Sequence, residues 1–361
     1  MKRIHNFSAG PAILPLAVLE EASRGVLEIN NSGMSILEVS HRGPDYEAIH
    51  ADAKERLLRV LRLSADTYTA LFMGGGASTQ FALLPMNLLN PGATADYVNT
   101  GEWGVKAIKE AKKFGTINVA ASSEAENFSH IPKTLNLTPN AAYVHITTNN
   151  TIEGTEWPAL PDTNGVPLVA DASSDIMARN LDYNKFDLIY AGAQKNAGPA
   201  GVTMVIAKKS LIEQGRDDIP AILSYKTHAK ADSLYNTPPV FPIYVVSLVL
   251  KWIEAQGGLS VIEQRNREKA AILYDALDKF PETYEPTVTD KGDRSLMNVT
   301  FRLRNSERDK EFLAGAQARD MDGLKGHRNV GGFRASIYNA FPIEGCAALA
   351  DYLRGFAGQS K

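Results

Sequence analysis

The stretch that decides the fold is Phe186-Asp187-Leu188-Ile189-Tyr190-Ala191-Gly192-Ala193-Gln194-Lys195-Asn196. It begins as a short apolar run, which predicts a buried strand, and it breaks at small residues just before the lysine. A second apolar run, residues 166–170, ends in Asp171. Because ligands bind outside the carboxyl ends of parallel strands, this acid and this lysine can face one ligand.

An acid and a lysine at neighbouring strand ends suit one cofactor in particular. Pyridoxal 5'-phosphate needs a lysine for its Schiff base and an acid that keeps the pyridinium nitrogen protonated. The alternative is a solvated surface lysine and an acid that caps a strand, and the two residues alone favour that alternative. The rest of the chain shifts the balance.

The composition limits the classes of protein to which the chain can belong. The chain has 361 residues, of which 44% are hydrophobic and 22% charged, as in an ordinary globular protein. Its net charge of −3 argues against nucleic acid as a partner. The single cysteine, Cys346, excludes an internal disulfide framework. We find neither a membrane-spanning stretch nor a signal peptide, and we expect a cytoplasmic protein without a metal site.

Short apolar runs alternate with helical or loop segments along most of the chain, which predicts an α/β fold with a mostly parallel sheet. Two long helices are predicted after a break at Pro238-Pro239, and alternating, half-exposed strands follow them. We therefore expect a large cofactor-binding domain over residues 16–256. Residues 1–15 and 257–361 are expected to form a smaller α+β domain. The predicted sheet strands are 69–73, 95–98, 117–120, 142–146, 168–170, 188–190 and 202–207.

A glycine-rich turn follows the first predicted strand. Gly74-Gly75-Gly76-Ala77-Ser78 leads into a helix predicted from about Phe81, and such a turn presents backbone N–H groups to an anion. It matches neither the Walker A motif nor the dinucleotide fingerprint. Trp103 follows another strand, where it can stack on a flat ring or simply pack.

Six blocks, taken together and in order, resemble phosphoserine aminotransferases, a family of class V, fold-type I pyridoxal-phosphate enzymes. The resemblance runs from about residue 5 to the C-terminus. Its blocks are residues 7–11, 38–42, 171–174, 190–196, 235–239 and 326–339. It implies reversible amino transfer between L-glutamate and 3-phosphonooxypyruvate, giving O-phospho-L-serine and 2-oxoglutarate. Whether 4-phosphohydroxy-L-threonine, an intermediate of pyridoxine biosynthesis, is also a substrate stays open.

The resemblance also implies roles for single residues. Lys195 would form the Schiff base and act as the general base, and Asp171 would pair with the pyridinium nitrogen. The other cofactor contacts would be Gly76, Ala77, Ser78, Trp103, Thr151 and Gln194, with Asn236 and Thr237 reaching the phosphate of the neighbouring subunit in a homodimer with shared sites. Arg334 would bind the substrate α-carboxylate, and the substrate phosphate would be bound by His41, Arg42, His327 and Arg328.

One departure and three alternatives remain. Some family members carry an arginine directly after the glycine run, where this chain has Ala77, so the number of cations around the substrate phosphate is open. Another class V aminotransferase, of the serine or alanine:glyoxylate type, leaves the two His-Arg pairs unexplained. A cysteine desulfurase needs a mobile cysteine, whereas Cys346 is predicted to lie in the core. A nucleotide-binding module does not explain Lys195.

Overall fold

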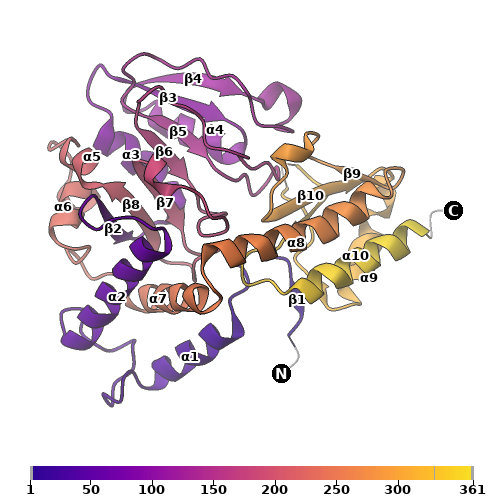
Figure 1. Ribbon diagram of the computed structural model, residues 1–361, viewed down its shortest axis with the longest axis horizontal. Helices are drawn as coiled ribbons and strands as arrows, with labels where there is room; N and C mark the ends of the chain where they lie inside the picture. The colour runs from indigo at the N-terminus through magenta and orange to yellow at the C-terminus, as the bar shows by residue number, and fades with distance from the viewer. Residues whose placement is uncertain (1–2, 329, 359–361) are drawn as a thin grey trace.

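The computed structural model of the protein describes residues 3–328 and 330–358. Residues 1, 2, 329 and 359–361 lie outside the described residues, and with them one position of the 326–339 block and the two ends of the predicted small domain. Figure 1 shows a large sheet flanked by helices, with a smaller group of strands and helices beside it that carries the C-terminus.

A seven-stranded, mostly parallel sheet forms the centre of the larger part, as predicted. The antiparallel exception is β8, which is antiparallel to both of its neighbours. The connection from β7 to β8 is too short for the crossover that a parallel pair requires. The strand order is β2 (Tyr68–Met73), β8 (Thr203–Lys208), β7 (Leu188–Gly192), β6 (Leu168–Asp171), β5 (Val144–Thr147), β3 (Thr94–Asn99) and β4 (Thr116–Ser122).

Both faces of this sheet are covered by helices. Along β7, Leu188 and Tyr190 belong to one core cluster, whereas Ile189 and Ala191 belong to the other. This alternation follows from the two-residue period of a strand and explains why the strand is apolar throughout. The first face packs against α3 (Gly76–Leu88), α4 (Glu102–Ala111), α5 (Lys209–Glu213) and α6 (Tyr225–Lys230). The second packs against α2 (Pro44–Val60) and α7 (Val240–Ala255), and α1 (Leu16–Leu27) packs against α7.

A separate hydrophobic core lies in the smaller part. Phe7 and Ile13 from the N-terminal segment pack there with C-terminal residues, and α8 (Leu259–Asp278) contributes to both cores. The domain boundaries at residues 15 and 256 stay predictions. The other elements are α9 (Asp309–Gln317), α10 (Ile343–Gly358), the antiparallel sheet of β9 (Tyr284–Pro286), β10 (Asn298–Leu303) and β12 (Phe333–Ser336), and the parallel pair of β1 (His5–Asn6) and β11 (Met321–Asp322).

The starts of two elements are set by local features that hydrophobic spacing does not record. The helix α3 begins at Gly76 rather than near Phe81, because Gly75 at φ 89° serves as its N-cap. A side chain at Gly75 would place its Cβ only 2.0 Å from Thr79 Oγ1. The strand β10 begins at Asn298, because Ser295 Oγ accepts hydrogen bonds from the N–H groups of Met297 and Asn298.

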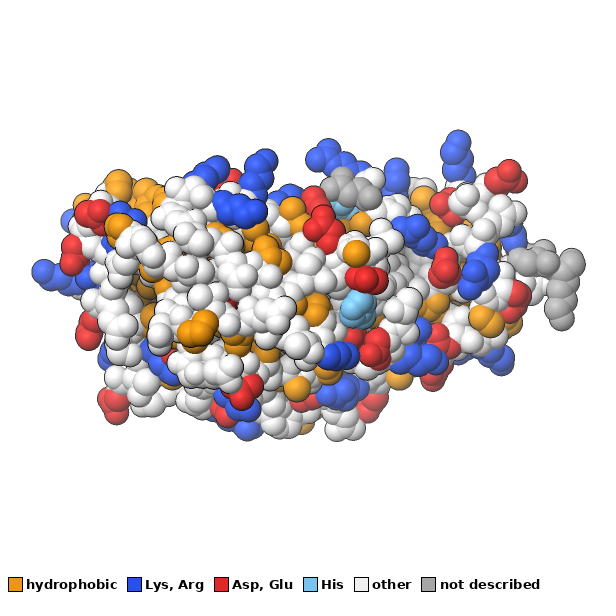
Figure 2. Space-filling view, turned by 90° about the horizontal axis from the view of Figure 1, so that it is seen from above, with side chains coloured by type: hydrophobic (Ala, Val, Ile, Leu, Met, Phe, Trp, Pro, Cys, Tyr) orange, Lys and Arg blue, Asp and Glu red, His pale blue; other side chains and the backbone are white. Residues whose placement is uncertain are grey.

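The surface and the helices add two observations. On the face that Figure 2 shows, Lys and Arg side chains alternate with Asp and Glu along the edges. Within the part of the chain that the structure describes, no single helix has the length and apolar character of a membrane span. Helices α7 and α8 meet that criterion only as a pair bent by 86°.

Candidate active site

The fold brings Lys195 and Asp171 to the same edge of the large sheet. Asp171 is the last residue of β6, and it pairs in register with Tyr190 of β7. Lys195 follows the end of β7 at Gly192. A side chain at Gly192 would place its Cβ 2.6 Å from the amide oxygen of Gln194, so the Gln194 side chain would have to move. The carboxyl ends of the two strands thus define the site, as the sequence predicted.

The Lys195 amine is held in a defined position. Its Nζ donates a hydrogen bond of 2.6 Å to Thr151 Oγ1 and lies 5.1 Å from the centroid of the Trp103 ring. Burial lowers the pKa of Lys195 to about 8, although the charge of Asp171 opposes the shift. An amine with this pKa exists in both protonation states near neutral pH, which suits a general base.

Asp171 is oriented from one side only. Its Oδ1 accepts two bonds from Ser173, 2.9 Å from the N–H and 2.6 Å from the hydroxyl, and Ser173 Oγ in turn accepts the Gly192 N–H. Burial raises the pKa of Asp171, while the Lys195 ammonium and the Ser173 donors lower it. Its Oδ2 has no donor among the described residues, so this oxygen can take a proton-bearing nitrogen from a ligand.

The glycine-rich turn opens the N-terminus of α3 to a ligand. No side chain caps this helix, and its first N–H groups have no partner within the helix. A Cβ built at Gly74 or Gly76 meets nothing within 4 Å. An uncapped helix start with free space beside it favours a phosphate. Gly76, Ala77 and Ser78 lie in this first turn, inside the helix rather than before it.

Arg334 contacts Thr151, as the lysine does, and further positive side chains act on His327. Arg334 of β12 donates from Nη1 to the Thr151 carbonyl at 3.1 Å, and its Nε is buried without a hydrogen-bond partner in the described structure. Burial lowers the pKa of His327, and the charges of Arg334, Lys106 and Arg328 add to that effect. Three positively charged side chains thus act on His327, and such a group attracts anions.

Two members of this site were missed by the sequence analysis. Lys106 lies one turn after Trp103 on α4. A helix predicted over this segment would have placed the two side chains on the same face. Glu153 is buried, and its Oε1 accepts the N–H of Glu102 at 2.8 Å. Burial raises the pKa of Glu153 to about 7, and Arg334 opposes the rise. No sequence pattern singled out this carboxyl.

The remaining predicted residues are not joined to this group within one chain. His41 and Arg42 precede α2, which begins at the lower left of Figure 1, far from the smaller part that carries Arg334. Asn236 and Thr237 are exposed in the loop between α6 and α7. No hydrogen bond or ion pair between any of the four and Lys195, Asp171 or Arg334 occurs among the described residues.

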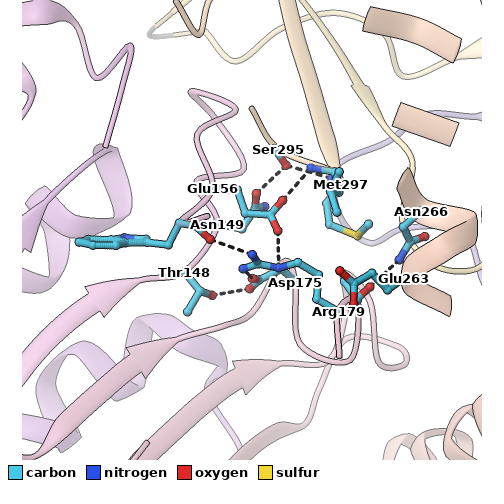
Figure 3. A network of polar contacts seen from close by, with 12 residues as sticks. Thr148, Asn149, Glu156, Asp175, Arg179, Glu263, Asn266, Ser295 and Met297 are labelled. Carbon is cyan, nitrogen blue, oxygen red and sulfur yellow. Dashed lines mark hydrogen bonds and ion pairs between the residues drawn. The ribbon is translucent and has the colours of Figure 1, made fainter. Parts of the chain in front are cut away.

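A buried polar network fixes the loops that carry the site. Arg179 pairs with Glu156 and Asp175, and it donates to the Trp157 carbonyl at 2.8 Å (Figure 3). Asn149 bonds Ser174 on one side and Ser295 on the other. The loops after β5 and β6 are thereby tied to the start of β10 in the smaller part.

The residues present fit pyridoxal phosphate. The site offers an acid with one unused oxygen, an uncapped helix start and a buried lysine. The indole of Trp103 borders the lysine, and its Nε1 is buried without a hydrogen-bond partner among the described residues. Together these groups match a ring nitrogen, a phosphate, an aldehyde and a flat ring.

Comparisons with known proteins agree with this geometry. The family model for class V aminotransferases matches residues 4–349, and the chain belongs to that family. It is 57% identical over 357 residues to the phosphoserine aminotransferase of Desulfosudis oleivorans, covering 98% of each chain. The structure of the phosphoserine aminotransferase from Bacillus circulans subsp. alkalophilus superposes with a TM-score of 0.97, at 52% identity and over 100% of both chains.

A third relative carries the cofactor. The phosphoserine aminotransferase of Trichomonas vaginalis with bound PLP superposes with a TM-score of 0.92 at 37% identity, covering 98% of this chain and 100% of that one. The comparisons confirm the resemblance, the α/β fold class and a pyridoxal-phosphate-dependent aminotransferase. They support the phosphoserine type over the serine or alanine:glyoxylate alternative. The roles of single residues stay predictions.

Proposed function

We propose that this chain catalyses the phosphoserine aminotransferase reaction, the reversible amino transfer between L-glutamate and 3-phosphonooxypyruvate. The observation that carries the proposal is that Arg334 and Lys195 both bind Thr151, while Arg334 and Arg328 act on His327. A substrate with a carboxylate at one end and a phosphate at the other needs cations at two separate points. Full-length relatives of this reaction type support the same conclusion.

The proton transfer falls to Lys195. Pyridoxal phosphate, when bound, supplies an electron sink that stabilises the negative charge left on the substrate Cα. Lys195 would take the proton from that carbon and donate it to the carbon that bore the aldehyde of the cofactor, so that one C–H bond breaks and another forms. Its hydrogen bond to Thr151 and the Trp103 ring hold the amine in place, and its lowered pKa of about 8 keeps part of it neutral.

Asp171 and Arg334 orient the reactants. The free Oδ2 of Asp171 would hold a proton on the ring nitrogen, with Ser173 fixing the carboxylate from behind. Arg334 would bind the α-carboxylate through its fork, while its bond to the Thr151 carbonyl sets the direction of that fork. His327 and Arg328 would then meet the substrate phosphate.

A homodimer with shared active sites is the second part of the proposal. His41, Arg42, Asn236 and Thr237 lie outside the site of their own chain, so a second copy would have to bring them to it. The exposed apolar side chains Leu16, Leu19, Leu27, Met34 and Leu37 lie along α1 and the segment between α1 and α2, and they suit an isologous interface. We also propose the cytoplasm as the location, since the single cysteine is free and buried.

The reaction is tested with single half-reactions of the purified enzyme. Conversion of the cofactor between its two forms is followed by absorbance with phosphoserine, glutamate, serine, alanine and 4-phosphohydroxy-L-threonine. We expect phosphoserine and glutamate to react with far higher kcat/KM than serine or alanine. Equal rates with serine and phosphoserine would contradict the proposal. The result with 4-phosphohydroxy-L-threonine decides a role in pyridoxine biosynthesis.

Subunit mixing tests the shared site. One chain carries Lys195→Ala, and the other carries Asn236→Ala with Thr237→Ala. If the loop acts across the interface, a mixed dimer has one doubly damaged and one intact site, and about half of the wild-type activity returns, by symmetry. If the loop serves its own chain, every site in the mixed dimer keeps one defect. No activity in mixed dimers verified by mass would rule the shared site out.

A further inference from the structure

Lys106 is a positively charged residue beside Trp103, and the proposed reaction assigns no role to it. It lies on α4 three residues after Trp103, so both side chains are on one face of the helix. Its Nζ lies 4.5 Å from the centroid of the Trp103 ring, the same ring that borders Lys195 at 5.1 Å. The cation–π contact therefore holds this ammonium against the ring that borders Lys195.

Lys106 is one of three positive side chains that act on His327. It is close enough to His327 to lower the pKa of that imidazole, together with Arg334 and Arg328. Glu102 is the acidic group that acts on the same imidazole. Within residues 3–328 and 330–358, Lys106 makes no ion pair. The like charges of Lys106, Arg328 and Arg334 all act on His327, so their arrangement is stabilised when a multiply charged anion enters.

The helix on the other side brings no charged side chain. The first turn of α3, which packs against α4, carries Ala77 and Ser78. A phosphate dianion in front of His327 and Arg328 would therefore meet a cation from the α4 side only through Lys106. The half-buried position of Lys106 makes such a contact stronger than a fully exposed one.

We propose that Lys106 is a specificity-determining residue that binds the phosphate of the substrate together with His327 and Arg328. This inference rests on the proposed function and deepens it. A phosphate carries more negative charge than the side-chain carboxylate of glutamate, so the ammonium discriminates between the two substrates by charge. The contact of Lys106 with Trp103 holds the ammonium in place before the substrate binds.

The test uses Lys106→Met, which keeps an unbranched chain over Trp103 but removes the charge, and Lys106→Arg, which keeps the charge. The matched control is Lys109→Met, an exposed lysine one turn further along α4. For Lys106→Met we expect kcat/KM to fall about tenfold with phosphoserine and about threefold with glutamate, mainly through KM. Lys106→Arg should restore most of the loss, and Lys109→Met should match the wild type.

Two readouts do not depend on turnover of phosphoserine. Inorganic phosphate should inhibit the glutamate half-reaction of Lys106→Met more weakly, by about tenfold in its inhibition constant. In a proton-NMR titration, the pKa of His327 should rise in Lys106→Met, because a neighbouring positive charge has been removed.

The outcomes separate this inference from the proposed function. Equal phosphate inhibition in Lys106→Met and wild type, or an unchanged His327 titration, would overturn the inference. Equal losses with both substrates, carried by kcat, would assign Lys106 to the support of Trp103 and would likewise overturn it. A wild-type enzyme that does not turn over phosphoserine would defeat the proposed function, while the phosphate and titration readouts would still decide the role of Lys106.

Discussion

The substitution Arg179→Met tests the buried network that joins the two parts of the fold. Arg179 is 4% exposed, and its partners Glu156 and Asp175 are 3% and 2% exposed. The guanidinium Nε lies 2.5 Å from Glu156, and Nη2 lies 3.3 Å from Asp175. Methionine fills a similar volume but leaves two carboxyl groups buried without their cation.

The expected loss follows from that burial. Removing one partner of a buried ion pair costs roughly 3–5 kcal/mol, because a charge is left uncompensated. With about 2 cal/mol/K of unfolding entropy per residue, a chain of 361 residues loses about 4–7 °C in Tm. The loss should depend on pH. Burial raises the pKa of Glu156 to about 7 and also raises that of Asp175, and Arg179 opposes both shifts.

Without Arg179 both carboxyl pKa values rise further above their unfolded values. Between the carboxyl pKa values of the wild type and those of the variant, the folded variant binds more protons than the folded wild type. The loss of Tm relative to the wild type is therefore largest near pH 8 and shrinks toward pH 5. Calorimetry at fixed, saturating cofactor measures this, since ligand binding itself shifts Tm. The control is Arg267→Met, because the Arg267 side chain is 61% exposed and pairs with Glu263. For this variant we expect a Tm loss of at most about 1 °C. An equal Tm loss in both variants, or a deficit that grows toward pH 5, would refute the reasoning.

Three further predictions concern the site. Borohydride reduction of the holoenzyme should fix the cofactor to the peptide that contains Lys195, and a label on Lys208 instead would show that the assignment is wrong. The rate at which the apo-protein forms its Schiff base should rise with pH to a midpoint of about 8, because the lysine must lose its proton; Asp171→Asn should move that midpoint down, since Asp171 stabilises the ammonium. A midpoint near 10 would contradict the burial argument. Arg334→Met should impair both half-reactions, whereas Arg328→Met should impair that of phosphoserine more, by roughly 2 kcal/mol or more in activation free energy; identical losses across both substrates would be inconsistent with separate carboxylate and phosphate sites.

The sequence predicted best those features that depend on a repeating pattern of apolar and polar residues. The apolar runs predicted the strands of the large sheet, because a strand covered on both faces is apolar throughout. Lys195 and Asp171 could be placed at one sheet edge because parallel strands end on the same side. Boundaries were less certain, since the left-handed backbone of Gly75 and the hydrogen bonds of Ser295 set the starts of α3 and β10, and no periodicity records either.

Other features depend on contacts between distant segments. Glu153 meets the start of α4, and Arg334 reaches the Thr151 carbonyl, across 183 residues of sequence. Arg179 is an unremarkable arginine in the sequence, yet burial makes it the cation that holds two carboxyl groups together. In the sequence Lys106 is one of several lysines of an amphipathic helix, and only the packing of that helix brings its charge close enough to act on His327. A sequence pattern determines which residues are buried in an element, whereas the distance between two charges is set only when the elements pack.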